Sequence, residues 1–193
     1  MSLLTDNEKN FLLRLARQSL EAAVRPEAPE ALAVVPDAVP PGLDQPAGAF
    51  VTLRKKGHLR GCVGYVLAAK PLYQTVMEAA AAAALRDPRF PPVEPAGLAD
   101  LEVEISVLSP CQPVRPEEIQ VGVHGLLITR NQARGLLLPQ VAVEHHWSRE
   151  RFLEETCRKA ALPADAWRQG ATIEAFTAEV FGGESWAGNG VSG

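Results

Sequence analysis

The chain is poor in cysteine. Three thiols occur in 193 residues, at Cys62, Cys111 and Cys157, and no two of them form a C-x-x-C pair. An odd number of widely spaced cysteines argues against a disulfide framework and against a thiolate zinc site. Any role for a thiol in this protein therefore rests on a single cysteine and its surroundings.

Aromatic residues, positive charge and long apolar runs are also scarce. Aromatics make up 6% of the chain, the formal net charge is −4, and basic and aromatic residues are not interleaved. These features argue against nucleic-acid binding by a general electrostatic grip. No apolar run approaches the roughly 18–20 residues that span a bilayer, and the first residues carry acids rather than a signal-peptide pattern. We expect a cytoplasmic protein without a membrane segment, for which nucleic acid is an unlikely partner.

Known cofactor and metal motifs are missing as well. The sequence contains no G-x-G-x-x-G, no G-x-x-x-x-G-K-[ST] and no G-x-S-x-G. The four histidines show no H-E-x-x-H spacing, and the adjacent pair His145–His146 would point apart on regular structure. We therefore expect no cofactor and no metal. A metal site assembled from distant residues, for example His58 or His124 with Glu104, is the weaker alternative.

Helical and extended patterns alternate along the chain. Thr5 and Glu8 have the spacing of a capping box, and apolar residues then recur at helical spacing as far as Val24. Six prolines between residues 26 and 46 predict a long extended segment that wraps around the domain. The remaining patterns predict a hairpin over 48–66, a helix over 70–87, a strand over 101–109, β-structure over 121–129 and 135–143, a helix over 148–162 and a strand over 171–181.

These elements favour one fold class. Because hairpins outnumber strand–helix–strand units, we expect an α+β fold with a mainly antiparallel sheet flanked by helices. We expect one domain over residues 5–181. The Gly/Ser-rich residues 182–193 are then a flexible tail.

The stretch "HLRGCVGY" carries the most chemistry. Side chains alternate along a strand, so Arg60 and Cys62 share one face. A neighbouring cation favours the thiolate, which is the reactive form of cysteine. The glycines Gly61 and Gly64 leave room either for a ligand or for close backbone packing. The alternative is that Cys62 is a small apolar filler on a buried strand.

The loop that follows the expected second helix is the next candidate. Arg86, Asp87, Arg89 and Phe90 lie together in "RDPRF". Two arginines and an aspartate could bind a carboxylate or phosphate through paired hydrogen bonds. The alternative is structural, with Asp87 capping the end of the helix or the loop and pairing with one of the arginines.

Several longer stretches resemble a known family. The segments "LRGCVGY", "LRDPRFPPV", "LEVEISVLS", "VHGLLI", "GLLLPQVAVEHHW" and "FLEETCRKAAL" occur in this order. They resemble the AMMECR-type domain family in its bacterial AmmeMemoRadiSam form, over residues 5–181. The resemblance implies an α+β fold with a larger lobe around an antiparallel sheet and a smaller second lobe. It also implies two partners, a Memo-like protein and a radical SAM protein, but no particular reaction.

Two main hypotheses follow for the function. In the first, a small polar ligand is bound or transformed at the "LRGCVG" strand, with Cys62 as nucleophile, Arg60 as the cation beside it, and His124 or Glu104 moving a proton. In the second, the protein is a non-catalytic interaction or scaffold module that docks through residues 86–95 or 26–46. Nucleic-acid binding is a weaker third idea. The expected ligand-binding residues are Gly61, Gly64, Asp87, Arg89, Phe90 and Gln140.

Overall fold

Antiparallel sheets form both parts of the chain. The structure, a computed structural model, describes residues 3–25 and 38–185. The chain divides into a first unit, Met1–Val107 with Glu179–Gly193, and a smaller second unit, Leu108–Ala178. Each unit contains a four-stranded sheet and helices. This arrangement confirms the expected α+β class with helices beside mainly antiparallel sheets and a smaller second lobe.

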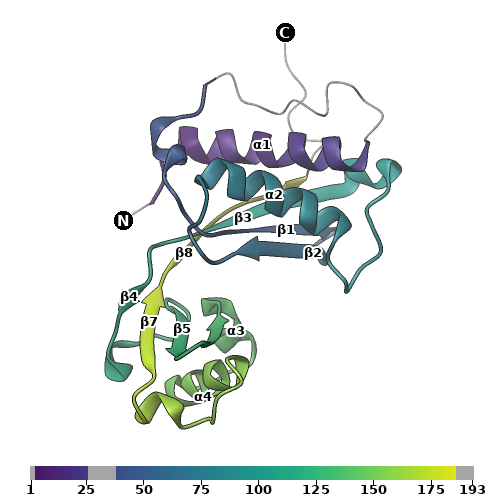
Figure 1. The fold of residues 1–193 in the computed structure, drawn as a ribbon. Coiled ribbons are helices and arrows are strands. Elements are labelled where there is room, and N and C mark those ends of the chain that lie inside the picture. The colour runs from purple at the N-terminus through teal and green to yellow at the C-terminus, as the bar shows by residue number, and fades with distance from the viewer. Residues whose placement is uncertain (1–2, 26–37, 186–193) are drawn as a thin grey trace. The chain divides into compact units, whose positions relative to one another are not determined.

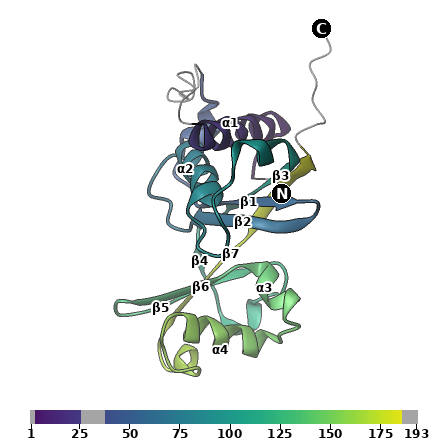
Figure 2. The same ribbon diagram turned by 90° about the vertical axis from the view of Figure 1, so that its right-hand side faces the viewer.

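The first unit is a sheet with two helices on one face. Its strands are ordered β2-β1-β3-β8, so β2 and β8 are the edge strands. Helices α1 and α2 lie side by side on the same face of this sheet (Figures 1 and 2). We call the opposite face the far face. The elements are α1 (Asp6–Val24), β1 (Ala49–Lys55), β2 (His58–Tyr65), α2 (Leu72–Leu85), β3 (Leu101–Leu108) and β8 (Ala178–Ser185), with 3-10 helices at Pro41–Asp44 and Pro95–Asp100.

The core of the first unit lies between the sheet and these helices. Val51 and Leu53 of β1 and Ile105 of β3 are fully buried there, because strand residues two apart face the same side. The predicted capping box at the start of α1 is confirmed, with Thr5 and Glu8 bonding to each other's backbone. Each fully buried aliphatic side chain contributes about 1.5–3 kcal/mol to stability.

Helix α2 comes very close to the edge strand. A Cβ atom added to Gly61 would lie 2.2 Å from the backbone carbonyl oxygen of Ala83. The alanine-rich surface of α2, including Ala79 and Ala80, has small side chains that permit this approach. Gly61 is therefore required for packing of the helix on the strand.

The second unit has its own sheet and core. Its strands are ordered β4-β7-β5-β6, and Phe152 and Leu153 of α4 are completely buried with Ile128 of β5. Ser148 caps α4 as expected, because its side chain accepts the backbone N–H of Arg151. The elements are β4 (Gln112–Pro113), β5 (Gly125–Arg130), β6 (Ala133–Leu137), α3 (Pro139–Glu144), α4 (Arg149–Lys159) and β7 (Thr172–Phe176), with 3-10 helices at Pro116–Glu118 and Ala166–Arg168.

Two expectations about this unit are wrong. The β-structure expected over 135–143 ends at Leu137, and α3 follows because Pro139 has the fixed φ and missing N–H that suit a first helical turn. The single strand expected over 171–181 is two strands, β7 and β8, which belong to different sheets. They separate at Thr177, whose N–H and carbonyl both bond to Ser109.

The expected wrapping segment and tail are described only in part. Residues 26–37 and 186–193 lie outside the described residues. Strand β8 extends to Ser185 and so includes the start of the segment expected as a tail. The single domain over 5–181 stays a prediction, and within it the chain forms the two units.

We predict that Gly61→Ala destabilises the protein. The added methyl would collide with backbone atoms of α2, and overpacking of this kind costs about 1–3 kcal/mol. Gly97→Ala is the matched control, because no atom lies within 4 Å of the position of its added Cβ. Urea unfolding should show a lower free energy of unfolding for Gly61→Ala and none of this loss for Gly97→Ala. Equal stabilities would contradict the packing role of Gly61.

Candidate functional site

The loop after α2 holds the edge of the sheet at Cys62. The backbone N–H of Cys62 donates to Oδ2 of Asp87 at 2.8 Å, and Nη2 of Arg89 donates to the Cys62 carbonyl at 3.3 Å. Both backbone groups of Cys62 are therefore satisfied by side chains at the edge of the sheet, where a strand usually has no partner. We call this arrangement the Asp87–Arg89 clamp.

The clamp is centred on a buried carboxylate. The Asp87 side chain is 3% exposed and also accepts the N–H, Nε and Nη2 of Arg89 at 3.1, 2.9 and 2.7 Å. Hydrogen bonding to the Arg89 guanidinium holds the pKa of Asp87 far below its usual range, the Cys62 N–H adds to this, and burial opposes it. Asp87 is therefore ionised at neutral pH. The structural alternative for this loop was that Asp87 pairs with one of the arginines, and the structure shows this pairing with Arg89.

The local sequence explains why Asp87 reaches the strand. Helix α2 ends at Leu85, and the N–H of Phe90 then bonds to the Asp87 carbonyl at 3.2 Å to close a turn. The N–H of Val93 returns to the carbonyl of Ala84 at 2.9 Å. Prolines on both sides of "RF" restrict the backbone of this loop. The carboxylate is thus fixed by a short, stiff connection.

The Cys62 thiol lies beside a hydroxyl on the far face. Thr52 is opposite Cys62 in the β1–β2 register, and its Oγ1 donates to Sγ at 3.3 Å. Glu104 of β3 is the register partner of Thr52. Cys62, Thr52 and Glu104 therefore occupy one row across three adjacent strands, and Cys62 is partly exposed there. A thiol, a hydroxyl and a carboxylate in a row can bind a polar group and exchange a proton with it.

The cation associated with Cys62 is Arg89. The Asp87 carboxylate raises the pKa of Arg89, and the Cys62 thiol makes a smaller contribution in the same direction. Arg60, which the strand pattern places on the face of Cys62, instead donates from Nη2 to the Pro92 carbonyl at 3.1 Å. Its Nη1 is buried and has no hydrogen-bond partner among the described residues. Arg60 thus contacts the same loop that carries the clamp.

The two glycines of β2 have packing partners. Gly61 faces the Ala83 carbonyl, and a Cβ on Gly64 would lie 2.3 Å from the ring of Phe50, its cross-strand partner. Their observed role is close packing on opposite faces of the strand. The sequence left two interpretations of these glycines, room for a ligand or close backbone packing. The observed contacts explain both glycines by packing.

Other predicted site residues are spread over both units. Phe90 lies beside the Arg89 guanidinium, with 5.5 Å from Cζ to the ring centroid. His124 belongs to the second unit, where its Nδ1 accepts the N–H of Gln120 at 3.2 Å. Gln140 lies in the first turn of α3 in that unit and is exposed.

Two features were missed by the sequence analysis. Thr52 is opposite Cys62 only because an irregularity between Leu53 and Arg54 shifts the β1–β2 register by one residue, and a regular hairpin register would have placed Thr52 opposite Gly61. A pocket of about 420 Å³ lies between the end of β2 and the start of α2. No sequence pattern indicates it, because a strand, a loop and a helix each supply part of its wall. Its lining residues are Gly64, Tyr65, Val66, Leu67, Ala69, Lys70, Thr75 and Glu78.

Within residues 3–25 and 38–185, no three or more His, Cys, Asp or Glu side chains are grouped so that they could hold a metal ion. None of the helices in these same ranges has the length and apolar character needed to cross a membrane.

Comparisons with known proteins agree along almost the whole chain. A family model described as AMMECR1 matches residues 13–181. A protein of Methanothermobacter thermautotrophicus is 46% identical over 186 residues, which cover 92% of this chain and 95% of the relative. A protein of Thermococcus kodakarensis is 44% identical, with 91% and 90% covered. The crystal structure of an uncharacterized protein from Pyrococcus horikoshii matches with a TM-score of 0.85 and 38% identity over 97% of each chain.

We predict that Asp87→Asn removes an acid-sensitive part of the stability. The folded-state pKa of Asp87 lies below the unfolded value of about 3.9, so its contribution is complete above that value and is lost as the pH falls toward the folded-state pKa. The variant keeps an acceptor for the Cys62 N–H but loses the charge. Its free energy of unfolding at pH 7 should fall by about 1.5–3 kcal/mol.

Denaturant titrations between about pH 2 and 7 measure this effect. Asp100→Asn is the matched control, because Asp100 forms an exposed ion pair with Lys55 at 2.9 Å, and such pairs contribute little. The pH dependence should be shallower in Asp87→Asn than in wild type and nearly unchanged in Asp100→Asn. Parallel curves for Asp87→Asn and wild type would show that the clamp does not stabilise the fold.

Proposed function

The chain belongs to the AMMECR1 family, and from this premise we propose that it binds or transforms a small polar ligand at Cys62. The site is the far face of the first sheet, where Cys62, Thr52 and Glu104 form a row. Cys62 is the nucleophile or thiolate of this site. The ligand carries an electrophilic or thiol-binding group that the sulfur can reach.

One observation carries the proposal: the thiol is fixed and has favourable neighbours. Both backbone groups of Cys62 are hydrogen-bonded by the Asp87–Arg89 clamp, and Sγ accepts the Thr52 hydroxyl at 3.3 Å. Hydrogen-bond donors and cations stabilise a thiolate, which is the reactive form. A nucleophile held in place by its surroundings loses little freedom when it meets a ligand.

The residues near Cys62 have the other roles in this proposal. Arg89 supplies the positive charge, because its guanidinium donates to the Cys62 carbonyl at 3.3 Å, and Thr52 supplies a hydrogen bond to the sulfur. We assign proton movement to Glu104, which is in the same row, rather than to His124, which belongs to the second unit. Arg60 supports the loop through Pro92.

The proposal includes partner proteins. The motif resemblance links chains of this kind to a Memo-like protein and a radical SAM protein, and it extends over residues 5–181. In this arrangement the chain is an accessory subunit that presents the Cys62 site to a group handled by the partners. Support for the partners comes from the resemblance and support for the site comes from the geometry, so the two parts are tested separately.

A non-catalytic interaction module is the second candidate. The observation that favours it is that Gly61, Gly64, Asp87 and Arg89 all have structural partners within the chain. Under this alternative these four residues build a rigid surface for docking. Association with the Memo-like or radical SAM protein would then survive Cys62→Ala and be lost when the exposed part of the 86–95 loop is altered.

We predict that native Cys62 reacts faster with iodoacetamide than the same thiol in the unfolded chain. The protein for this test carries Cys111→Ser and Cys157→Ala, so that Cys62 is the only thiol. At pH 7 the folded protein should react at least about threefold faster than the urea-unfolded protein. A native rate equal to or below the unfolded rate would contradict a reactive Cys62.

Matched variants assign the effect to its cause. Arg89→Gln removes the charge, Arg89→Lys keeps it, and Thr52→Val removes the hydroxyl at nearly constant shape. Arg89→Gln and Thr52→Val should lower the rate of Cys62 alkylation in the native protein. Arg60→Gln should leave this rate near that of the wild type. Thermal unfolding of each variant confirms that it is folded when its rate is measured. A loss with Arg60→Gln but not with Arg89→Gln would overturn the assignment of the cation.

A further inference from the structure

The pocket between β2 and α2 is a second candidate site, separate from the thiol. It lies within the first unit and has a volume of about 420 Å³, within the range of roughly 300–1,000 Å³ that is typical of small-molecule sites. Tyr65 lies two and four residues from Val63 and Gly61, so it shares the face of β2 that packs against α2, whereas Cys62 points to the far face. The pocket and the thiol therefore use opposite faces of one strand.

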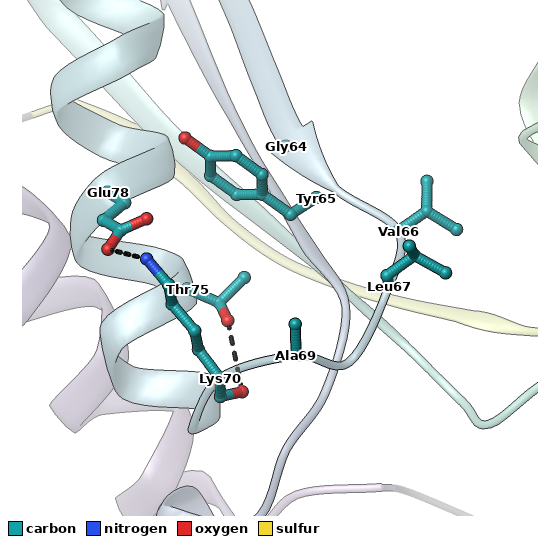
Figure 3. Close-up of a pocket in the computed structure, with 8 residues that line it drawn as sticks. All are labelled: Gly64, Tyr65, Val66, Leu67, Ala69, Lys70, Thr75 and Glu78. Atoms are coloured by element: carbon teal, nitrogen blue, oxygen red, sulfur yellow. Dashed lines mark hydrogen bonds and ion pairs between the residues drawn. The ribbon is translucent and has the colours of Figure 1, made fainter.

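The pocket combines an apolar wall with one pair of opposite charges. Figure 3 shows Tyr65, Val66, Leu67 and Ala69 along the strand and loop, with the Tyr65 ring directed toward α2 and the Val66 side chain directed away from it. The side chains of Tyr65 and Leu67 remain accessible, with 38% and 57% of their residue surface exposed. Exposed large apolar side chains gathered around a hollow are typical of a binding site.

The charged pair lies on the other side of the pocket. The Lys70 ammonium donates to the Glu78 carboxylate at 2.5 Å, from the loop before α2 to the helix itself (Figure 3). Both side chains are almost half exposed, so the pair contributes little to stability and separates at small cost. The Thr75 hydroxyl is already bonded to the Pro71 carbonyl at 3.2 Å. Lys70, Glu78 and the Tyr65 hydroxyl are therefore the polar side-chain groups that a ligand would meet.

This chemistry selects a ligand with both charges. A purely cationic or anionic ligand would satisfy one member of the pair and leave the other without its partner. A molecule with an ammonium beside a carboxylate can bind Glu78 and Lys70 together, while an apolar side chain covers Tyr65 and Leu67. We propose that the pocket binds a free α-amino acid with an apolar side chain. This site is separate from the thiol site, and ligand binding in the pocket does not depend on Cys62.

Calorimetric titration of the full-length protein with L-leucine tests the proposal. We expect saturable binding that weakens at least about tenfold for glycine, which lacks the apolar group, and for isoamylamine and 4-methylpentanoate, which each carry one charge. Absence of saturable L-leucine binding up to about 10 mM would overturn the proposal. Equal binding of isoamylamine or of 4-methylpentanoate would overturn the choice of a zwitterion.

Variants locate the binding within the molecule. The double variant Lys70→Met/Glu78→Gln should weaken L-leucine binding at least about tenfold. The matched control Lys55→Met/Asp100→Asn removes another exposed ion pair of the same unit and should bind as wild type does. Both pairs are exposed, so folding is expected to survive, and thermal unfolding verifies it. Unchanged binding in the first double variant would overturn the assignment of the site.

One further variant separates this site from the proposed function. Cys62→Ala should leave L-leucine binding unchanged, because the thiol points to the far face. Failure of the alkylation experiment with intact L-leucine binding would reject the thiol site alone. Loss of L-leucine binding in Cys62→Ala would contradict two independent sites.

Discussion

The first unit depends on the hydrogen bonds that the buried carboxylate of Asp87 accepts. This carboxylate bonds to the backbone of Cys62 and to three groups of Arg89, while Arg89 bonds to the Cys62 carbonyl. A side-chain pair thus satisfies an edge strand in the way that a neighbouring strand would, and it ties the end of α2 to that strand. Removal of one partner from such a buried charged group is costly because the other hydrogen-bonding groups lose their partner too.

The two faces of β2 make different contacts. Gly61 allows α2 to pack at backbone distance on one face, and the pocket begins where that packing ends near Tyr65. On the far face, the Cys62 thiol is next to Thr52 and in line with Glu104. The proposed thiol site and the packing of the helix therefore share one strand.

Local patterns predicted the elements that depend on neighbouring residues. The Thr5–Glu8 capping box, the hairpin and the Ser148 cap were all predicted, because each follows from short-range chemistry. The pairing of Asp87 with one of the two nearby arginines was one of two alternatives, and the sequence could not show that the partner is Arg89 or that Cys62 is the third member. Contacts of that kind depend on tertiary packing, as do the pocket and the assignment of Arg89 rather than Arg60 as the cation associated with Cys62.

Hydrogen exchange of the Cys62 amide tests the central role of the clamp most directly. In the wild type this N–H bonds to a buried carboxylate, so its exchange should be slowed to the level of amides in the β1–β2 ladder. In Asp87→Ala the same amide should exchange far faster, while amides in the core of the second unit, such as Ile128, keep their protection. Exchange of the wild-type Cys62 amide at the rate of an unprotected edge residue would contradict the account.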